Sequence, residues 1–99
     1  MTKENLQGVF SPVITPFNRD FTVDHKKLAK QCEWLISQEV GLAVFGTNSE
    51  ANSLSVDEKI FLLDKVIDYG IDPGKLMPGT GCCSMTDTIN LTKHAVKVG

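Results

Sequence analysis

Apolar and polar residues follow one another along this chain in blocks that predict strands and helices in turn. Apolar runs occur at residues 9–15, 42–45 and 76–77, and a break rich in Gly, Thr and Pro follows each run. After each break comes a segment whose apolar residues recur every three to four positions, which is the period of an α-helix. The pattern therefore predicts a strand and then a helix, three times over.

The helical segments carry start signals that agree with this periodicity. The first segment, residues 25–38, has Asp24 at its N-cap position. The second starts with a capping box, in which Ser55 and Glu58 can satisfy each other's free backbone amides. The third begins near Ser84. The residues expected to face inward are Leu28, Cys32, Leu35, Ile36, Ile60, Leu63, Val66, Ile67, Leu91, Ala95 and Val98.

The spacing of the predicted strands indicates a fold class. They begin at residues 9, 42 and 76, which are 33 and 34 residues apart, and this spacing is typical of βαβ crossovers and a parallel sheet. Three such strands alone leave an apolar sheet edge open, whereas eight units give roughly 260 residues, the size of a TIM barrel. We therefore expect an α/β fold in which residues 1–99 form the N-terminal part, about three-eighths, of one (β/α)8 TIM-barrel domain, in a truncated or partial chain.

Composition and charge narrow the function classes. A net charge of −2 gives no reason to expect nucleic acid or an anionic membrane surface as a partner. The basic cluster of Lys26, Lys27 and Lys30 falls on the outer face of the first predicted helix. No apolar run approaches the roughly 20 residues that span a bilayer, and residues 1–5 lack the apolar core of a signal peptide. We expect a cytoplasmic protein.

The cysteines and histidines do not form a metal-binding pattern. Cys32 lies on the apolar stripe of a helix and is predicted to be a small core residue. Cys82 and Cys83 are adjacent, without the CxxC spacing of a zinc site, so no metal is expected. His25 and His94 lie near a helix start and a helix end, where solvent-facing or capping roles are expected.

The strongest functional signal is the polar segment at residues 46–50, which reads Gly-Thr-Asn-Ser-Glu and directly follows the apolar run at residues 42–45. Ligands of α/β proteins bind at the carboxyl ends of parallel strands. A glycine, hydroxyls, an amide and a carboxylate at such a strand end predict a ligand site. We expect Glu50 to orient this loop rather than to act as a general base, because a base needs a defined geometry toward a substrate proton.

Five sequence landmarks then point to a family. They are residues 8–17 (Gly-Val-Phe-Ser-Pro-Val-Ile-Thr-Pro-Phe), Val23-Asp24, residues 46–50, Leu54-Ser55-x-x-Glu58 and Gly79-Thr80-Gly81. In this order they resemble the N-terminal part of the dihydrodipicolinate synthase/N-acetylneuraminate lyase family. The resemblance implies a (β/α)8 barrel, usually a homotetramer, that binds pyruvate or another 2-oxo acid as a lysine Schiff base and makes or cleaves a C–C bond with an aldehyde. It implies no cofactor.

The resemblance also assigns roles within the loop. Thr47 corresponds to a catalytic hydroxyl in a proton relay with tyrosines, and Thr47 and Asn48 correspond to the residues that bind the substrate carboxylate through amides and hydroxyls. Asn48 replaces a usual threonine. Ser49 replaces a glycine, so a left-handed backbone there would carry a steric penalty. The sub-activity stays open among 4-hydroxy-tetrahydrodipicolinate synthase, N-acetylneuraminate lyase and a 2-keto-3-deoxy sugar acid or 4-hydroxy-2-oxoglutarate aldolase.

The residues that carry out the reaction in the family have no counterpart in this sequence. The Schiff-base lysine, the relay tyrosine and the substrate-binding arginine come from later strands and loops of the family barrel. The lysines at positions 59, 65, 75, 93 and 97 fall on predicted helices or on helix-to-strand connections. We therefore expect the 99-residue chain alone to lack aldolase activity.

Two other interpretations remain. The segment from Gly79 to Ser84 partly follows the G-x-G-x-x-G pattern, which would indicate a nucleotide- or phosphate-binding α/β module, although the third glycine is missing. The other interpretation is an inactive remnant of the family. The aromatic residues do not separate these possibilities, because Phe10, Phe17, Phe45 and Phe61 are predicted to lie in the core and Trp34 at a helix or subunit contact.

Overall fold

The computed structural model describes residues 7–99, which contain two parallel strands and three α-helices. The strands are β1 (Phe10–Pro12) and β2 (Gly41–Ala43). The helices are α1 (His25–Ser37), α2 (Val56–Asp68) and α3 (Met85–Val98). Three short 3-10 turns join them, namely η1 (Thr47–Ser49), η2 (Ala51–Ser53) and η3 (Pro73–Lys75).

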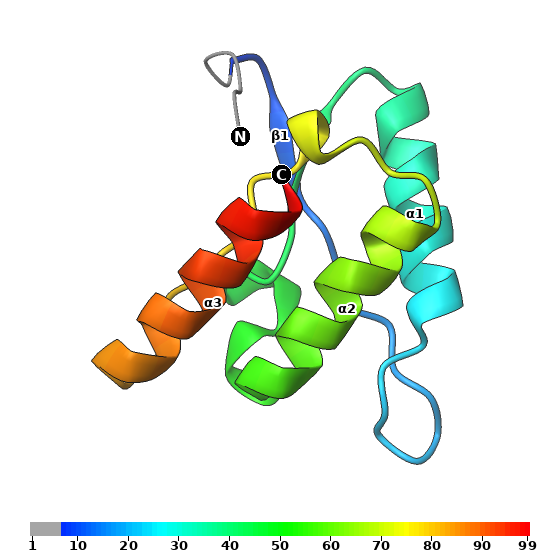
Figure 1. The fold of residues 1–99 in the computed structure, drawn as a ribbon. Coiled ribbons are helices and arrows are strands. Elements are labelled where there is room, and N and C mark those ends of the chain that lie inside the picture. The colour runs from blue at the N-terminus through cyan, green and yellow to red at the C-terminus, as the bar shows by residue number, and fades with distance from the viewer. Residues whose placement is uncertain (1–6) are drawn as a thin grey trace.

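The helices pack side by side against the strands, with α2 between α1 and α3 (Figure 1). β1 and β2 pair in parallel, with Phe10 opposite Gly41 and Pro12 opposite Ala43. The first crossover, β1–α1–β2, therefore has the connectivity that the strand spacing predicts. The polar segments after β1 and β2 consequently leave the sheet at the same edge.

The expected third strand, at residues 76–77, is reduced to an isolated bridge between Leu76 and Leu42. The backbone still follows β2, because the amide of Met77 donates to the carbonyl of Leu42 at 2.8 Å and the amide of Gly79 donates to that of Val44 at 2.7 Å. Within residues 7–99, the count of three strand–helix units is thus not confirmed. The fold class, α/β with parallel pairing, is confirmed.

The two paired strands are also shorter than the apolar runs at residues 9–15 and 42–45. Phe45 has φ of 61°, a left-handed backbone that departs from extended strand geometry. Residues 42–45 nevertheless include three buried side chains, those of Leu42, Val44 and Phe45. The hydrophobic pattern predicted the burial of this segment correctly but overestimated the length of the strand.

The predicted helix starts are confirmed in atomic detail. The Asp24 side chain accepts from the amide of Lys27 at the start of α1. At α2, the Ser55 hydroxyl accepts from the amide of Glu58 and the Glu58 carboxylate accepts from the amide of Ser55, both at 3.0 Å. These bonds satisfy amides that have no partner within the helix.

The core forms where the helices meet the strands, and most of its members follow the predicted periodicity. Cys32 is fully buried, as expected. On α2, Leu62 is buried in addition to Leu63 and Val66, whereas Ile60 and Ile67 are only half-buried. Residues of the core cluster are Val13, Leu28, Cys32, Leu35, Leu42, Val44, Phe45, Leu54, Leu62, Leu63, Val66, Ile71 and Leu76.

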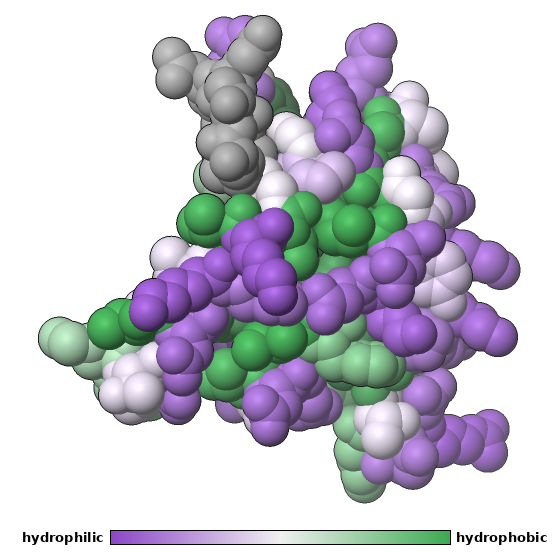
Figure 2. Space-filling view, viewed as in Figure 1, coloured by the Kyte–Doolittle hydropathy of each residue, from purple (hydrophilic) through white to green (hydrophobic). Residues whose placement is uncertain are grey.

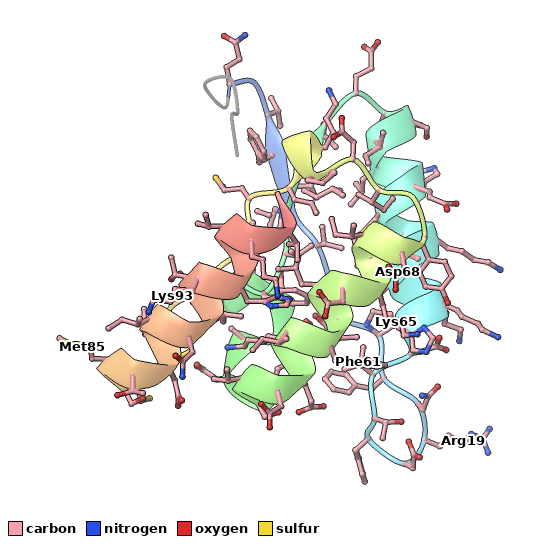
Figure 3. The ribbon with its side chains drawn as sticks, in the orientation of Figure 1. Arg19, Phe61, Lys65, Asp68, Met85 and Lys93 are labelled. Carbon is pink, nitrogen blue, oxygen red and sulfur yellow. The ribbon has the colours of Figure 1, made fainter. Side chains whose placement is uncertain are left out.

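Two predicted core residues are in fact exposed. Phe17 and Phe61 are 38% and 51% exposed, so the prediction that they lie in the core is wrong. Figure 3 shows Phe61 and Lys65 on α2; the Lys65 ammonium lies 5.4 Å from the Phe61 ring centroid, and the ring also makes an edge contact with His25. A cation–π contact and an aromatic contact make this partly solvated position favourable.

Hydrophilic side chains cover much of the face in Figure 2, with hydrophobic ones visible between them. Lys26, Lys27 and Lys30 are exposed, as predicted. No helix in the part of the chain that the structure describes is long and apolar enough to cross a membrane. The prediction that the N-terminus lacks a signal peptide concerns residues 1–5, which lie outside the described residues.

Candidate functional site

The polar loop after β2 is a tight, closed turn. It begins at Phe45 and ends at Glu50, which has φ of 60° and ψ of 36°, and the short helix η1 lies between these two left-handed residues. The carbonyl of Gly46 accepts from the amides of Ser49 at 2.9 Å and Ala51 at 3.2 Å. The loop therefore has a defined backbone shape that does not depend on a ligand.

Thr47 and Asn48, the predicted carboxylate-binding residues, face outward from this turn. Both side chains are exposed. Among residues 7–99, no hydrogen-bond acceptor is seen for either backbone amide, because these amides are the first of η1 and have no carbonyl partner within it. Two amides and the Thr47 hydroxyl are thus available to an anion from solvent.

Ser49 and Glu50 anchor the loop to β1 and β2. The Glu50 carboxylate accepts from the amide of Thr15 at 3.0 Å, and the Thr15 hydroxyl donates to the carbonyl of Ser49 at 2.6 Å. The Ser49 hydroxyl donates to the carbonyl of Ala43 at 3.3 Å, and Ser49 is fully buried. The structure therefore gives Glu50 the loop-orienting role that was expected.

The steric penalty anticipated for a left-handed Ser49 does not arise. Ser49 keeps a negative φ within η1, and the left-handed residues are its neighbours Phe45 and Glu50. The serine hydroxyl is used for the bond to Ala43, an interaction that a glycine could not make. The substitution at this position is compatible with the turn.

A third strand-end segment, residues 79–81, packs directly against the loop. A Cβ atom placed on Gly79 would lie 2.6 Å from the carbonyl oxygen of Phe45, so only a glycine allows the two backbones this close. The amide of Gly79 is bonded to the carbonyl of Val44. The ends of all three predicted strand segments therefore meet at one edge of the fold, as the parallel topology requires.

A pocket of about 510 Å³ lies beside this edge, between the starts of α2 and α3. Its lining includes Asn52, Lys59, Asp87 and both adjacent cysteines, but neither Thr47 nor Asn48. Lys59 is only 4% exposed and lies on α2, one of the helices on which lysines are predicted. Helical spacing is a signal that could have found its burial, because Lys59 precedes the buried Leu63 by four positions and the buried Val66 by seven.

The histidines form specific pairs. His94, expected near solvent or at a helix cap, instead lies between α2 and α3, with its Nε2 atom 2.7 Å from the Asp64 carboxylate. His25 Nδ1 lies 3.0 Å from the Tyr69 hydroxyl. Neither pair includes a residue of the 46–50 loop, and within the described range no three His, Cys, Asp or Glu residues form a cluster that could hold a metal ion.

This arrangement defines a class of protein: an α/β unit with a preformed polar turn at the carboxyl ends of parallel strands. The profile of the Dihydrodipicolinate synthetase family matches residues 5–99, and the chain belongs to this family. The resemblance carried by the five sequence landmarks is therefore confirmed. The family match favours a lyase over a nucleotide-binding module.

Individual relatives agree with this assignment. The chain is 35% identical over 100 residues to the 4-hydroxy-tetrahydrodipicolinate synthase of Desulforamulus reducens. The alignment covers all of this chain and 34% of that protein. It also matches the solved dihydrodipicolinate synthase of Acinetobacter baumannii in complex with pyruvate, with 33% identity, a TM-score of 0.83 and coverage of 96% of this chain and 33% of the other.

A solved N-acetylneuraminate lyase from Fusobacterium nucleatum matches as well, with 26% identity, a TM-score of 0.83 and coverage of 93% of this chain and 32% of that one. The chain thus spans about a third of the length of each of these relatives. Its structural neighbours are TIM-barrel enzymes, and the chain corresponds to part of such a barrel.

Proposed function

We propose that residues 46–50 bind the carboxylate of pyruvate or another 2-oxo acid, as part of a class I aldolase or lyase that makes or cleaves a C–C bond through a lysine Schiff base. One observation carries the proposal. The amides of Thr47 and Asn48 and the Thr47 hydroxyl are unpaired with any described residue and project from a turn that Glu50 and Ser49 hold in place. The relative from Acinetobacter baumannii, solved with pyruvate, supports the choice of ligand.

The chemistry of the loop suits a carboxylate. Backbone amides directed at one point bind anions, and hydrogen bonds to an ionised carboxylate are shorter and stronger than neutral ones. The Asn48 side chain offers an N–H donor where the family has a hydroxyl, so the capacity to donate is kept. Because the turn is already formed, little conformational freedom is lost on binding.

The remaining parts of the reaction are assigned by resemblance. Thr47 would relay a proton between tyrosines, yet Tyr69 is the one tyrosine in the sequence, and its hydroxyl lies 3.0 Å from the His25 ring. The relay tyrosines and the Schiff-base lysine are therefore assigned to further β/α units of a TIM-barrel domain of which residues 1–99 form about three-eighths. We further propose that the whole protein is a cytoplasmic homo-oligomer that uses an aldehyde as its second substrate.

Three sub-activities are compatible with the proposal, and they differ in the aldehyde partner: 4-hydroxy-tetrahydrodipicolinate synthase, N-acetylneuraminate lyase and a sugar-acid or hydroxy-oxoglutarate aldolase. All three use a 2-oxo acid, and its carboxylate is the group that we propose residues 46–50 bind. Asn48 in place of threonine distinguishes the chain from the usual family loop. The proposal therefore rests on the 2-oxo acid and not on the aldehyde.

Titration of the isotopically labelled chain with pyruvate, followed through its backbone amide resonances, tests the proposal. We expect shifts centred on Thr47 and Asn48. Thr47→Val should weaken binding by roughly tenfold to a hundredfold, because a hydrogen bond to a charged group contributes roughly 1.5–3 kcal/mol. Thr86→Val is the matched control, since Thr86 is also an exposed threonine and makes no side-chain hydrogen bond to a described residue.

Two results would contradict the proposal. One is an absence of pyruvate-dependent shifts in residues 46–50. The other is a response to a nucleoside phosphate centred on residues 79–84 with none to pyruvate, which would favour the nucleotide-binding interpretation.

A further inference from the structure

Two adjacent cysteines, Cys82 and Cys83, line the pocket between α2 and α3. They precede Ser84, the N-cap of α3, and Met85, the first residue of that helix, which Figure 3 labels at its outer end. Adjacent side chains on a regular extended segment point to opposite sides. Here the chain bends at Cys83 and Ser84, and both cysteines line the same pocket.

Both thiols are at least partly exposed, and the Cys82 thiol donates to the carbonyl of Thr80 at 3.6 Å. Cys82 is half-buried, Cys83 is exposed, and neither forms a disulfide with a described residue. Cys32 differs from both, because it is fully buried and its pKa is raised to about 11, first by burial and then by the charge of Glu33. A thiol reagent should therefore distinguish the pair from Cys32 in the folded chain.

The backbone around Cys82 is held in place by Thr88 of α3. The amide of Cys82 donates to the Thr88 hydroxyl at 3.1 Å, and that hydroxyl lies 3.4 Å from the carbonyl of Cys82. Thr88 also bonds to the carbonyl of Ser84 at 3.1 Å. The backbone of Cys82 is thus fixed to the first turn of α3 and need not be ordered when a ligand binds.

Two thiols are too few for a structural zinc site, which needs four ligands. A trivalent organoarsenic centre needs only two, because its carbon substituent supplies the third bond. Thiolates are the soft ligands that such a thiophilic centre selects. The pocket of about 510 Å³ leaves room for an aryl substituent next to the two sulfurs.

We propose that Cys82 and Cys83 form a vicinal dithiol site that chelates trivalent arsenicals. With an arylarsine oxide, two As–S bonds form while the two S–H bonds and the bond between arsenic and oxygen break. The two protons leave with the oxygen as one water molecule. Arsenic stays trivalent and both sulfurs keep their oxidation state, so the step needs no oxidant or reductant.

Phenylarsine oxide is the probe that tests this site on the native chain, with intact mass spectrometry as the readout. We expect one phenylarsenic group per chain, located by digestion on the peptide that holds Cys82 and Cys83. The adduct should survive an excess of 2-mercaptoethanol and be removed by 2,3-dimercaptopropanol. The resistance of the adduct to removal by 2-mercaptoethanol should fall roughly a hundredfold in Cys82→Ser or Cys83→Ser, because arsenic is then held by one sulfur and no longer by two.

Cys32→Ala is the matched control and should retain the adduct like the wild-type chain; circular dichroism checks that each variant is folded. If a variant fails to fold, the test still stands, because digestion of the wild-type chain shows which cysteines carry the phenylarsenic group. Three results would overturn the proposal: an adduct that forms only in urea, an adduct on Cys32, or wild-type and single-serine adducts that are equally labile to the monothiol.

Discussion

Glu50 combines an unfavourable backbone with a favourable side-chain contact. Its left-handed φ of 60° costs an L-residue on the order of 1–2 kcal/mol. Its carboxylate accepts from the amide of Thr15 in a partly buried setting, and a hydrogen bond to a charged group contributes roughly 1.5–3 kcal/mol. The contact is thus large enough to offset the strain, which explains how a non-glycine residue ends the turn.

Cys32 gives the folded chain a specific pH dependence. Its pKa is raised from 9.0 to about 11 in the fold, so the folded state disfavours the thiolate. The stability that this thiol contributes is fully present below pH 9 and is lost as the pH rises through 11. We expect the unfolding free energy of the wild-type chain to fall by up to about 2–3 kcal/mol across this window, since one pKa unit corresponds to about 1.4 kcal/mol.

Urea unfolding over this pH range, with Cys32→Ala as control, measures the effect. The alanine variant is less stable throughout because it leaves a cavity, but it keeps Tyr69 and every lysine. The difference between the two chains should therefore shrink as the pH rises. A difference that stays constant with pH would show that Cys32 does not titrate differently in the two states.

At the scale of elements, the fit of residues 79–81 against the 46–50 loop depends on one missing Cβ atom. Gly79→Ala would place that atom 2.6 Å from the carbonyl oxygen of Phe45. We expect the variant to lose about 1–3 kcal/mol of unfolding free energy, the usual cost of overpacking, and to shift the amide resonances of residues 45–50. Thermal or urea unfolding measures the first effect.

Gly81→Ala is the matched control, since a Cβ there meets no atom within 4 Å and its φ lies outside the left-handed range. It should leave both stability and the loop resonances close to those of the wild-type chain. Equal losses in the two variants would mean that chain flexibility, and not the contact with Phe45, explains the effect.

The helices could be predicted well because their signals are local. The caps at Asp24, Ser55 and Ser84 each bond to a residue three positions further on, so the printed sequence contains both partners side by side. The strands were less predictable. The left-handed backbone at Phe45 lies against Gly79, which is far away in the sequence, and hydrophobic periodicity does not encode such a contact.

The loop residues of the candidate site could also be read from the sequence, but their surroundings could not. The segment 46–50 follows a buried run, which is visible without a structure. The bonds from Thr15 to Glu50 and Ser49 span 35 and 34 positions and carry no sequence signature. The pocket that Cys82 and Cys83 share with the start of α2 likewise joins segments that are far apart in the sequence.

At the scale of the whole molecule, exposed apolar side chains lie along the strand segments. Val9, Ile14 and Met77 are 71%, 55% and 44% exposed. Relatives in this family are about three times as long as this chain, and in a closed barrel each strand is flanked by others. Exposed apolar side chains on strand segments agree with the proposal that the chain is part of a barrel.

The chain alone should not form a Schiff base with pyruvate. Lys65 lies over the Phe61 ring on α2, and Lys93 is exposed on α3 (Figure 3). The catalytic lysine implied by the family resemblance has no counterpart among these positions. Incubation with pyruvate and borohydride should leave the mass of the chain unchanged, while a Schiff-base aldolase treated in parallel gains the reduced adduct.

A stable adduct on any lysine would contradict this expectation. An adduct on Lys59 would be the most informative failure, since this lysine is almost fully buried and lines the pocket. It would indicate that the chain carries a reactive amine of its own, and peptide mapping would identify it.

The hydrogen bond between Thr15 and Glu50 also has a consequence for the order in which the chain assembles. Its partners are 35 residues apart, and closing a loop of that length costs entropy that only later contacts repay. During synthesis, residue 15 leaves the ribosome well before residue 50, so the end of β1 must wait for β2 to follow α1 into place. We therefore expect the turn at residues 46–50 to form late in folding and to be complete only when the first crossover has closed.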